Sequence, residues 1–491
     1  MIVLGDVTGA ETGAGGSVRL PGRGAQAALL AATFMGILDV LIVNVAAPSI
    51  QRDLRAGFSD IQLVISAYVL AYAVGLTTGG RLGGAYGHKR VFVTGLLAFA
   101  AMSTACAAAP NVDVLVVLRI GQGLAAALML PQVLALIQTV FPPEERPRAL
   151  AGYGATLGLG AIAGQLLGGL LLDLDVLGLG WRSVFLVNVP VGLVAAAGAA
   201  VLLPASRPGP RQRLDVPGLL LTALAMTLLV YPLIRGQASG WPPWIWPSFA
   251  GSVLALAALW RVERRCAEAG GSPLVRPALL RKRGFSLGLA VVVAFYSGNY
   301  GLFLLLAYVF QEGMHLSPLG SGTAFLPLGV GFAAASMAGR KLVARHGENV
   351  LVAGAGAMAA GYLVLIVTLL PGPASTAPLA ALAMAPALLV AGAGGGLVAA
   401  PLVGSILATV PAEDAGAGSA VLLTVNQAAI SLGVAVFGTL FVALLGADPQ
   451  DAAASMPVTD FTEALIGCSW LLVALAVVTG LLIRRLPRRA R

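Results

Sequence analysis

The stretch GILDVLIVNVAAPSI, residues 36–50, decides the fold and carries one acid, Asp39, near its middle. Asp39 is the only charged residue between Ala25 and Ile50, a run of 26 residues that is long enough to cross a bilayer as a helix. An ionised Asp at the centre of such a helix costs roughly 2.5–3.5 kcal/mol on insertion scales, so its presence favours a functional role. The alternative is a polar contact between helices, or a position nearer the membrane surface.

The composition of the whole chain is that of a polytopic membrane protein. Of its 491 residues, 58% are hydrophobic and 10% are charged, with a mean hydropathy of +0.90, whereas soluble domains carry about 25% charged residues. The net charge of +9 does not indicate a nucleic-acid partner, because the basic residues lie in short loops where they set topology. The three Cys and three His show neither metal-ligand spacing nor a disulfide framework, so we expect no metal and no cofactor.

Fourteen apolar runs predict fourteen transmembrane helices and an all-α fold. The expected spans are 26–50, 61–83, 91–109, 112–140, 150–172, 182–204, 215–235, 245–261, 284–311, 318–339, 349–371, 376–404, 416–446 and 463–483. The run 245–261 is the weakest, since it is short and follows WPPWIWP, which is typical of an interfacial aromatic belt. The Gly-rich start of the chain lacks the features of a secretory signal, so we expect a disordered tail there.

The distribution of Lys and Arg supports this count of spans. When the loops are assigned to alternate sides, 25 basic residues fall on the side of the termini, four on the other side and one, Arg119, inside a span. Because cytoplasmic loops carry the excess of Lys and Arg, both termini are expected in the cytoplasm and the protein in the cell membrane. Removing one internal span would scramble the pattern.

Two loops indicate that the chain is built from two related halves. GGRLGGAYGHKR (79–90) follows the second span and GRKLVARHG (339–347) follows the tenth, and the Gly, Leu and Gly at 79, 82 and 87 recur 260 residues later. Related halves are the usual construction of a secondary transporter, with the substrate site between them near the midplane. We therefore predict a tail over 1–25, six-helix bundles over 26–204 and 284–486, two inserted spans within 205–283, and a basic tail over 487–491.

Taken in order, the motifs resemble those of the major facilitator superfamily, and specifically its fourteen-span drug:proton antiporters. The resemblance covers nearly the whole chain and rests on LDVLIVNVAAPSI (38–50), the loop 79–90, LRIGQGLAAA (118–127), GLGAIAGQLLGG (158–169), WRSVFLVNVPVG (181–192) and LDVPGLLLTA (214–223). It implies a transporter rather than an enzyme, which exports drugs, antibiotics or other lipophilic or cationic compounds in exchange for protons by alternating access. We expect a small-molecule substrate, contacts with membrane lipids, and a monomer.

Two alternatives to drug export are considered. The cargo of such a transporter could also be an endogenous metabolite or a siderophore. The alternative class is an integral-membrane enzyme acting on lipids, which is disfavoured because no span carries an acidic pair for a metal-bound pyrophosphate. ATP hydrolysis is disfavoured because the chain has no GxxxxGK[ST] loop.

Arg119 is the second charge inside a span and is predicted to lie near Asp39. Arg119 is about six residues below the outer surface and Asp39 about eleven, which at 1.5 Å per residue places them at depths of roughly 9 Å and 16 Å. A long Arg side chain bridges that difference. The resemblance implies a role for this Arg in proton transfer, so we predict that Asp39 and Arg119 form the proton-coupling pair. The alternative is an Arg that extends to the outer interface.

Other polar residues at depth are candidates for a roomy substrate cavity of apolar, aromatic and a few polar groups. They are Tyr68, Tyr72, Gln122, Gln165, Tyr296, Asn299, Tyr300, Asn426 and Gln427. The alternative for each is a hydrogen bond between helices. Glu312, at the end of the ninth span, is predicted to be a solvated loop acid.

Glycines and basic residues form the candidate structural and gating motifs. Gly160, Gly164 and Gly168 recur every four residues and therefore share one face of a helix, which permits close packing. The resemblance implies that this face seals a leak between the halves, and the alternative is a packing seam only.

The loop 79–90 supplies the second group of candidate structural and gating residues. They are Gly80, Leu82, Gly87, Lys89 and Arg90. The family pattern has an Asp where this sequence has Gly84 and an Arg where it has Ala85, so the charged latch that the resemblance implies is weaker or rebuilt here. Lys89 and Arg90 are expected to bind lipid headgroups or helix C-termini, or to be solvated.

Overall fold

The computed structural model describes residues 23–486, except 207, 210–214, 272, 274–275, 373–376 and 412–413. Residues 1–22 of the predicted tail 1–25 and the predicted tail 487–491 lie outside the described residues, whereas residues 23–25 belong to the first helix. Within the described part the chain is helical, with no strand, and fourteen helical segments are long and apolar enough to cross a membrane. The predicted fold class and the number of spans are confirmed.

The helices follow the predicted apolar runs closely. The first six spans are α1 (Arg23–Leu54), α2 (Phe58–Tyr86), α3 (His88–Ala107), α4 (Val112–Val140), α5 (Arg146–Asp173), and α6 (Ser183–Leu186) with α7 (Asn188–Leu202). The next two are α8 (Val216–Ala238) and α9 (Ile245–Glu268), followed by the short α10 (Pro277–Arg281). The last six are α11 (Arg283–Tyr308) with the π-helical turn η3 (Val309–Gly313), α12 (Pro318–Ala324) with α13 (Leu326–His346), α14 (Asn349–Leu369), α15 (Ala377–Leu407), α16 (Ala415–Leu445) and α18 (Val458–Arg484), with the short α17 (Pro449–Ser455) before α18.

Two spans are interrupted at a single residue where their sequences predict continuous helices: the sixth at Val187, between α6 and α7, and the tenth at Phe325, between α12 and α13. The run 318–339 forms two helices, α12 and α13, separated at Phe325. Pro327 lies in the first turn of α13, where its missing N–H costs nothing because no carbonyl of the same helix would accept it there. The break at Phe325 therefore follows from a proline that favours the start of a helix over its interior.

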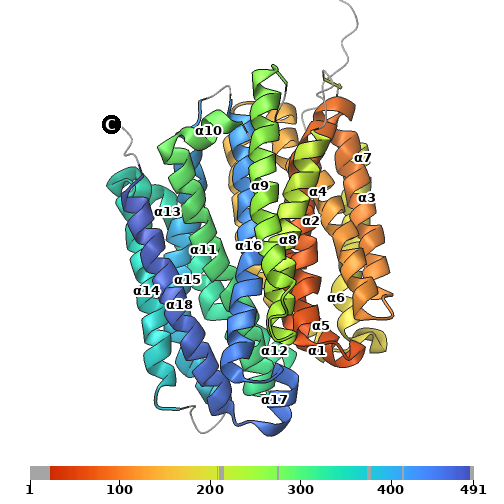
Figure 1. Ribbon diagram of the computed structural model, residues 1–491. Helices are drawn as coiled ribbons and strands as arrows, with labels where there is room; N and C mark the ends of the chain where they lie inside the picture. Colours follow the sequence, from red (N-terminus) through yellow and green to blue (C-terminus); the bar gives the residue numbers. More distant parts are fainter. Residues whose placement is uncertain are drawn as a thin grey trace, which may run out of the picture.

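The helices form two large groups, and a pair of further helices, α8 and α9, lies between them (Figure 1). In the first group α1 packs on α5 and α7, and α4 packs on α2 and α3; in the second, α15 packs on α13 and α14, and α18 packs on α11 and α14. The groups meet where α2 contacts α16 and α5 contacts α12. The inserted helices α8 and α9 pack on each other, and α8 also contacts α2 and α16.

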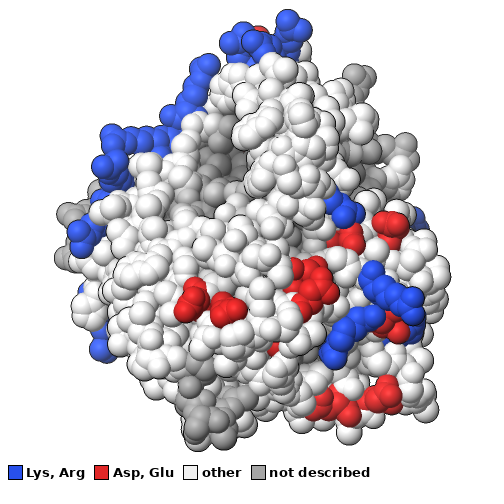
Figure 2. Space-filling view, turned by 60° about the horizontal axis from the view of Figure 1, so that its bottom comes forward, with Lys and Arg blue, Asp and Glu red and all other residues white. Residues whose placement is uncertain are grey.

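Both ends of the described chain lie on one face of the bundle, here called the terminal face (Figure 1). The opposite face, called the far face, carries α17 and the loops that precede α2 and α6. In Figure 2, where the far face comes forward, most of the surface is uncharged, several acidic patches lie on it with one group of basic side chains among them, and further Lys and Arg lie along the upper and left edge. This asymmetry agrees with the distribution of charge among the loops.

The two related loops each have a Gly with positive φ at the end of a helix. Gly87 ends α2 with φ 95° and Gly347 ends α13 with φ 64°, a region that favours Gly. Each donates its N–H to the carbonyl four residues earlier, Gly83 and Val343, at 2.9 and 2.8 Å. The repeat seen in the sequence is therefore a repeated helix end followed by a tight turn into the next helix.

Candidate functional site

Asp39 and Arg119 form an ion pair that is buried inside the first group of helices. Asp39, in the middle of α1, has no exposed surface, and Arg119 on α4 is 1% exposed. Arg119 Nη1 lies 2.6 Å from Asp39 Oδ2. The contact expected from their depths is present, which places two charges side by side where neither is in contact with bulk water.

Three further polar side chains complete the environment of the carboxylate. Asp39 Oδ1 accepts hydrogen bonds from Gln122 Nε2 at 2.8 Å and from Asn188 Nδ2 at 2.9 Å. The same two amides donate to Ser103 Oγ at 2.7 and 3.2 Å. Helices α1, α3, α4 and α7 each supply a member, so the network joins four helices around one negative charge. Hydrogen bonds made by charged groups are stronger than those between neutral groups, so this network fixes the position of the carboxylate.

Arg119 has its own set of partners. Its Nε donates to the carbonyl of Val64 at 3.2 Å, and its Nη1 donates to Gln122 Oε1 at 2.7 Å. The guanidinium carbon lies 4.2 Å from the centre of the Tyr68 ring, within the range of a cation–π contact. The charge of Arg119 is therefore shared between a carboxylate, two carbonyl groups and an aromatic face.

Sequence reasoning found the pair but not its complete surroundings. Gln122, predicted to line the substrate cavity, is fully buried in this network instead. It lies three residues after Arg119 and so shares its face of α4. Ser103 and Asn188 were missed, although Asn188 is part of WRSVFLVNVPVG. The available signal was an Asn inside an apolar run, where an unpaired amide is costly.

The predicted cavity tyrosines meet across the boundary between the two groups of helices. Tyr68 and Tyr72 of α2 and Tyr296 and Tyr300 of α11 belong to one apolar cluster, which also includes Tyr153 of α5. Tyr72, Tyr153, Tyr296 and Tyr300 are half-buried, while Tyr68 has no exposed surface. We name these five residues the tyrosine cluster. Because Tyr68 also contacts Arg119, the cluster is in direct contact with the buried ion pair.

The other cavity candidates are distributed around this cluster. Asn426 of α16 forms a side-chain hydrogen bond with Tyr296 and is half-buried. Asn299 is also half-buried, with Nδ2 near Gly395 of α15, and Gln427 is 8% exposed. Gln165 is 2% exposed and donates to the carbonyl of Leu41 at 3.4 Å. It therefore lies in the contact between α1 and α5.

The glycine face of α5 packs within the first group and not between the groups. A Cβ on Gly160, Gly164 or Gly168 would lie 3.2, 3.0 or 2.9 Å from side chains of α1. The contact of α5 with the second group uses neighbouring positions, since a Cβ on Gly169 would lie 2.4 Å from the carbonyl of Pro318. The structure thus favours the packing seam over a direct seal between the halves.

The segment 79–90, predicted as a loop, forms the last turns of α2, Gly87 and the start of α3, and it has hydrogen bonds both within the first group and, from Arg81 to the Pro273 carbonyl at 2.9 Å, outside it. Lys89 Nζ donates to the carbonyl of Leu203 at 2.5 Å, at the C-terminal end of α7, where a cation is favoured by the helix dipole. Gly84 faces open space, because no atom lies within 4 Å of the place that a Cβ would take, and the same holds for Gly80. Arg90 lies on the surface, where it lines a groove of about 240 Å³ with Leu82.

Glu312 differs from its prediction as a solvated loop acid. It is 8% exposed and lies on the π-helical turn η3, 4.0 Å from Arg52 Nε. The extra residue of the π-helical turn places Glu312 in the boundary between the two groups at the far face, where Gln311 Nε2 donates to the carbonyl of Val45 at 2.9 Å. Among the described residues no group of three or more His, Cys, Asp or Glu could hold a metal ion.

An all-helical bundle of two groups with a buried ion pair defines a polytopic secondary transporter. Residues 29–434 match the Major Facilitator Superfamily, and the chain belongs to that family. It is 38% identical over 440 residues to the "Probable actinorhodin transporter" of Streptomyces coelicolor, covering 89% of this chain and 76% of that protein. It is 36% identical to the puromycin resistance protein pur8 of Streptomyces alboniger, covering 93% and 90%, and 32% identical to the cephamycin export protein CmcT of Amycolatopsis lactamdurans, covering 92% and 90%.

Solved structures share the fold. The crystal structure of a D-xylose–proton symporter superposes with a TM-score of 0.64 at 14% identity, covering 94% of this chain and 97% of that one. A bacterial homologue of the human lysosomal transporter Spinster, inward-facing and unoccupied, gives 0.62 at 17% identity, covering 94% and 96%. These likenesses extend to the arrangement of helices, and the protein is a transporter rather than an enzyme.

Proposed function

We propose that this protein exports a drug-like compound, such as an antibiotic or a related natural product, across the cell membrane in exchange for protons. Relatives named for actinorhodin, puromycin and cephamycin support this cargo class. The observation that carries proton exchange is Asp39, a fully buried carboxylate paired with Arg119. Coupling requires a group that binds and releases a proton, and a guanidinium does not deprotonate in proteins, so Asp39 takes this role.

The proton and the cargo are coupled through Arg119. A proton on Asp39 Oδ2 removes the negative charge that faces Arg119 Nη1 at 2.6 Å. The guanidinium then depends on the Val64 carbonyl, Gln122 and the Tyr68 ring for compensation, so its position shifts. Tyr68 transmits that shift to the tyrosine cluster, where a lipophilic or cationic cargo binds on aromatic faces from both groups of helices.

The terminal face lies in the cytoplasm in this proposal. The support is the excess of Lys and Arg in the loops of that face. A reporter fused after Arg491, or placed in the segment between Arg261 and Arg283, is expected to report the cytoplasm, and one between Asp448 and Asp460 the outside. An external signal from the 261–283 segment would contradict this orientation.

The proposal is tested in proteoliposomes with an imposed pH gradient, using puromycin and the cationic dye ethidium as probes. Everted vesicles with an acidic lumen should accumulate a transported probe with the wild-type protein. Asp39→Asn should bind the probe but fail to accumulate it. Asp53→Asn is the matched control, because Asp53 also pairs with an Arg at 2.7 Å, Arg182, but on the surface. Accumulation by Asp39→Asn at the wild-type rate and with the same pH dependence would show that the proton binds elsewhere.

A further inference from the structure

The inserted helix α8 contacts both groups of helices through its far-face half. Val230 and Ile234 of α8 are 1% exposed and pack in one apolar cluster with Ala435 of α16 and with Leu63 and Leu70 of α2. In the half of α8 nearer the terminal face, the carbonyl of Ala225 instead accepts a hydrogen bond from Ser252 of α9 at 2.8 Å. The far-face end of α8 thus packs against both groups as well as on its inserted partner α9, where Gly236 lies close to Ile245.

Polar bonds strengthen the same contact on both sides of α8. Toward the first group, Arg235 Nη2 lies 2.7 Å from Asp60 Oδ1, and Arg235 Nη1 donates to Ser59 Oγ at 3.3 Å. Toward the second group, the carbonyl of Leu233 accepts a hydrogen bond from Thr439 Oγ1 at 2.9 Å. Leu233 and Arg235, two residues apart on α8, therefore bind the two groups of helices: Arg235 binds α2 and Leu233 binds α16.

These bonds lie at the level where the two groups of helices are closed against each other. Asp448, at the start of α17, accepts a hydrogen bond from the N–H of Phe58 at 2.8 Å and another from Gln51 Nε2 at 2.7 Å. Gln51 Oε1 in turn accepts one from the hydroxyl of Tyr308 at 2.8 Å. The structure is thus closed at the far face, and the contacts of α8 belong to that closed state.

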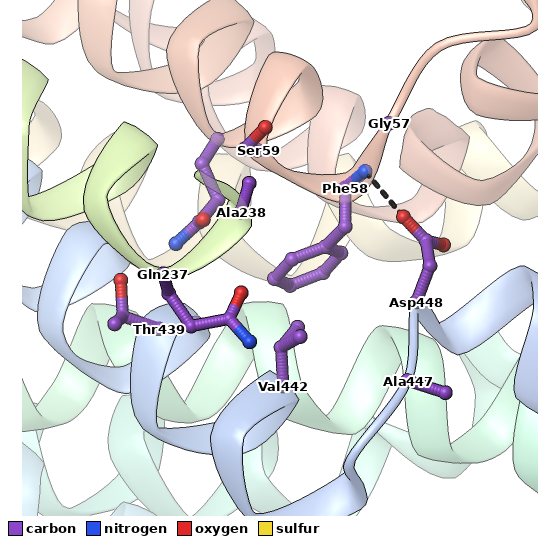
Figure 3. Close-up of a pocket in the computed structure, with 11 residues that line it drawn as sticks. Gly57, Phe58, Ser59, Gln237, Ala238, Thr439, Val442, Ala447 and Asp448 are labelled. Carbon is purple, nitrogen blue, oxygen red and sulfur yellow. Dashed lines mark hydrogen bonds between the residues drawn. The ribbon is translucent and has the colours of Figure 1, made fainter. Parts of the chain in front are cut away.

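A crevice beside α8 shows that three separate units meet there (Figure 3). It encloses about 310 Å³ and is lined by Phe58 and Ser59 of α2, Gln237 of α8, Thr439 of α16 and Asp448. Its walls come from the first group, the inserted pair and the second group. Separation of the two groups at the far face would pull these walls apart, and α8 could then keep its bonds to only one of them.

We propose that α8 is a clamp that stabilises the state closed at the far face, by binding α2 with Arg235 and α16 through the carbonyl of Leu233. A contact shifts a conformational equilibrium only when its free energy differs between the two states. The bonds of Arg235 and Thr439 differ between the two states as a pair. We call them the two arms of the clamp, the Arg235–Asp60 ion pair and the Thr439–Leu233 hydrogen bond, and α8 connects the two groups only while both are intact. This gives the inserted pair a role that is independent of the identity of the cargo and of the proton site.

The test measures the separation of the two groups at the far face by spin-label distances in lipid nanodiscs without a gradient. Labels are placed at Leu177→Cys and Ala454→Cys, two exposed far-face positions in different groups, with the partly exposed Cys266 replaced by Ser. Arg235→Gln should raise the ratio of open to closed distances about twofold to fivefold, the effect expected of a partly exposed ion pair. Arg235→Lys should restore most of the closed population.

Arg182→Gln is the matched control. Arg182 pairs with Asp53 at 2.7 Å and is 34% exposed, close to the 29% of Arg235, but both partners belong to the first group. This variant should leave the distances unchanged. Thr439→Val should act like Arg235→Gln, and the double variant should open no further than either single one, since losing one arm already releases the clamp. The clamp is ruled out if Arg235→Gln matches Arg182→Gln, or if the effects of the two arms add.

Discussion

The two groups of helices share a loop repeat but differ in what lies inside them. The interior of the first group holds Asp39 and Arg119 with three amide and hydroxyl partners. In the described part of the second group, each Asp, Glu, Lys and Arg lies in a loop or within about two turns of a helix end, and the interior offers only neutral polar groups such as Ser297, Asn299 and Asn426. One group carries the charge, and the other supplies apolar and hydrogen-bonding surface.

This difference teaches where coupling has to pass. In the proposed mechanism the proton binds at the ion pair inside the first group, so we expect its effect to reach the second group through side chains that contact both. Tyr68 meets this condition, since it stacks on Arg119 and belongs to the tyrosine cluster with Tyr296 and Tyr300. The following predictions test this division of roles.

The largest effect is expected from unbalancing the ion pair. Asp39→Asn leaves Arg119 buried without its carboxylate, and breaking a buried pair from one side costs about 3–5 kcal/mol. The neutral double variant Asp39→Asn/Arg119→Gln should recover most of the lost thermal stability in detergent. It should still fail to accumulate cargo against a gradient, because no group remains to carry the proton.

This double variant separates folding from coupling. A single Asn variant as stable as the wild type would mean that Arg119 has another counter-charge. Gradient-driven accumulation by the double variant would place the coupling group outside the pair, with Glu312 as the next acid to test.

A smaller effect is expected at Tyr68, which links the two groups. The Tyr68 hydroxyl is buried and has no hydrogen-bond partner, so Tyr68→Phe should retain the contact with Arg119 and transport within about twofold of wild type. Tyr68→Leu loses the aromatic face, and a desolvated cation–π contact is worth about 2 kcal/mol, so coupled export should fall about thirtyfold. Initial rates of probe export under a fixed pH gradient measure both. Equal rates for Phe and Leu would remove Tyr68 from the coupling route.

The sequence predicted the fold well because the lengths of apolar runs determine where helices cross a membrane. The run 284–311 became α11 with its π-helical turn, and 416–446 became α16 within one residue. It did not predict the break at Phe325 or the π-helical turn that buries Glu312. Both depend on the local backbone conformation within an apolar run, which hydropathy does not determine. These breaks change which side chains face the boundary without changing hydropathy.

The candidate site was predicted only as far as one-dimensional depth allowed. Depth along two helices was enough to bring Asp39 and Arg119 together. It could not add Ser103 or Asn188, because their helices are placed beside α1 by tertiary packing. For the same reason the glycine face of α5 was recognised, but the helix that fills it was not.

The third prediction compares the repeated loops. Gly87→Ala should lower thermal stability more than Gly347→Ala, because a Cβ at Gly87 would also lie 2.8 Å from the Ser206 carbonyl, whereas nothing lies within 4 Å at Gly347. The positive φ alone costs about 1–3 kcal/mol in each case, since both glycines lie in sparsely populated backbone regions. Thermal unfolding in detergent gives the order. Equal losses would show that the turn after α2 yields to accommodate the methyl group.

The smallest effect is expected at Gly84, which stands where the motif that the sequence resembles has an Asp. No atom lies within 4 Å of a side chain added here, and the Gly84 carbonyl that accepts the N–H of Gly209 at 2.8 Å does not change on substitution. Replacing Gly by Asp inside a helix gains a few tenths of a kcal/mol of propensity, and a negative charge near the C-terminal end of α2 costs a similar amount.

Gly84→Asp should therefore keep stability within about 0.5 kcal/mol of wild type and leave transport unchanged or improved. Any gain would come from a new charge contact with the basic end of α13, which contains Lys341 and Arg345. Gly84→Ala is the control that adds a side chain without a charge. If Gly84→Asp abolishes transport at normal expression while Gly84→Ala does not, the charge itself obstructs the cycle, and the protein works without an acidic latch at this position.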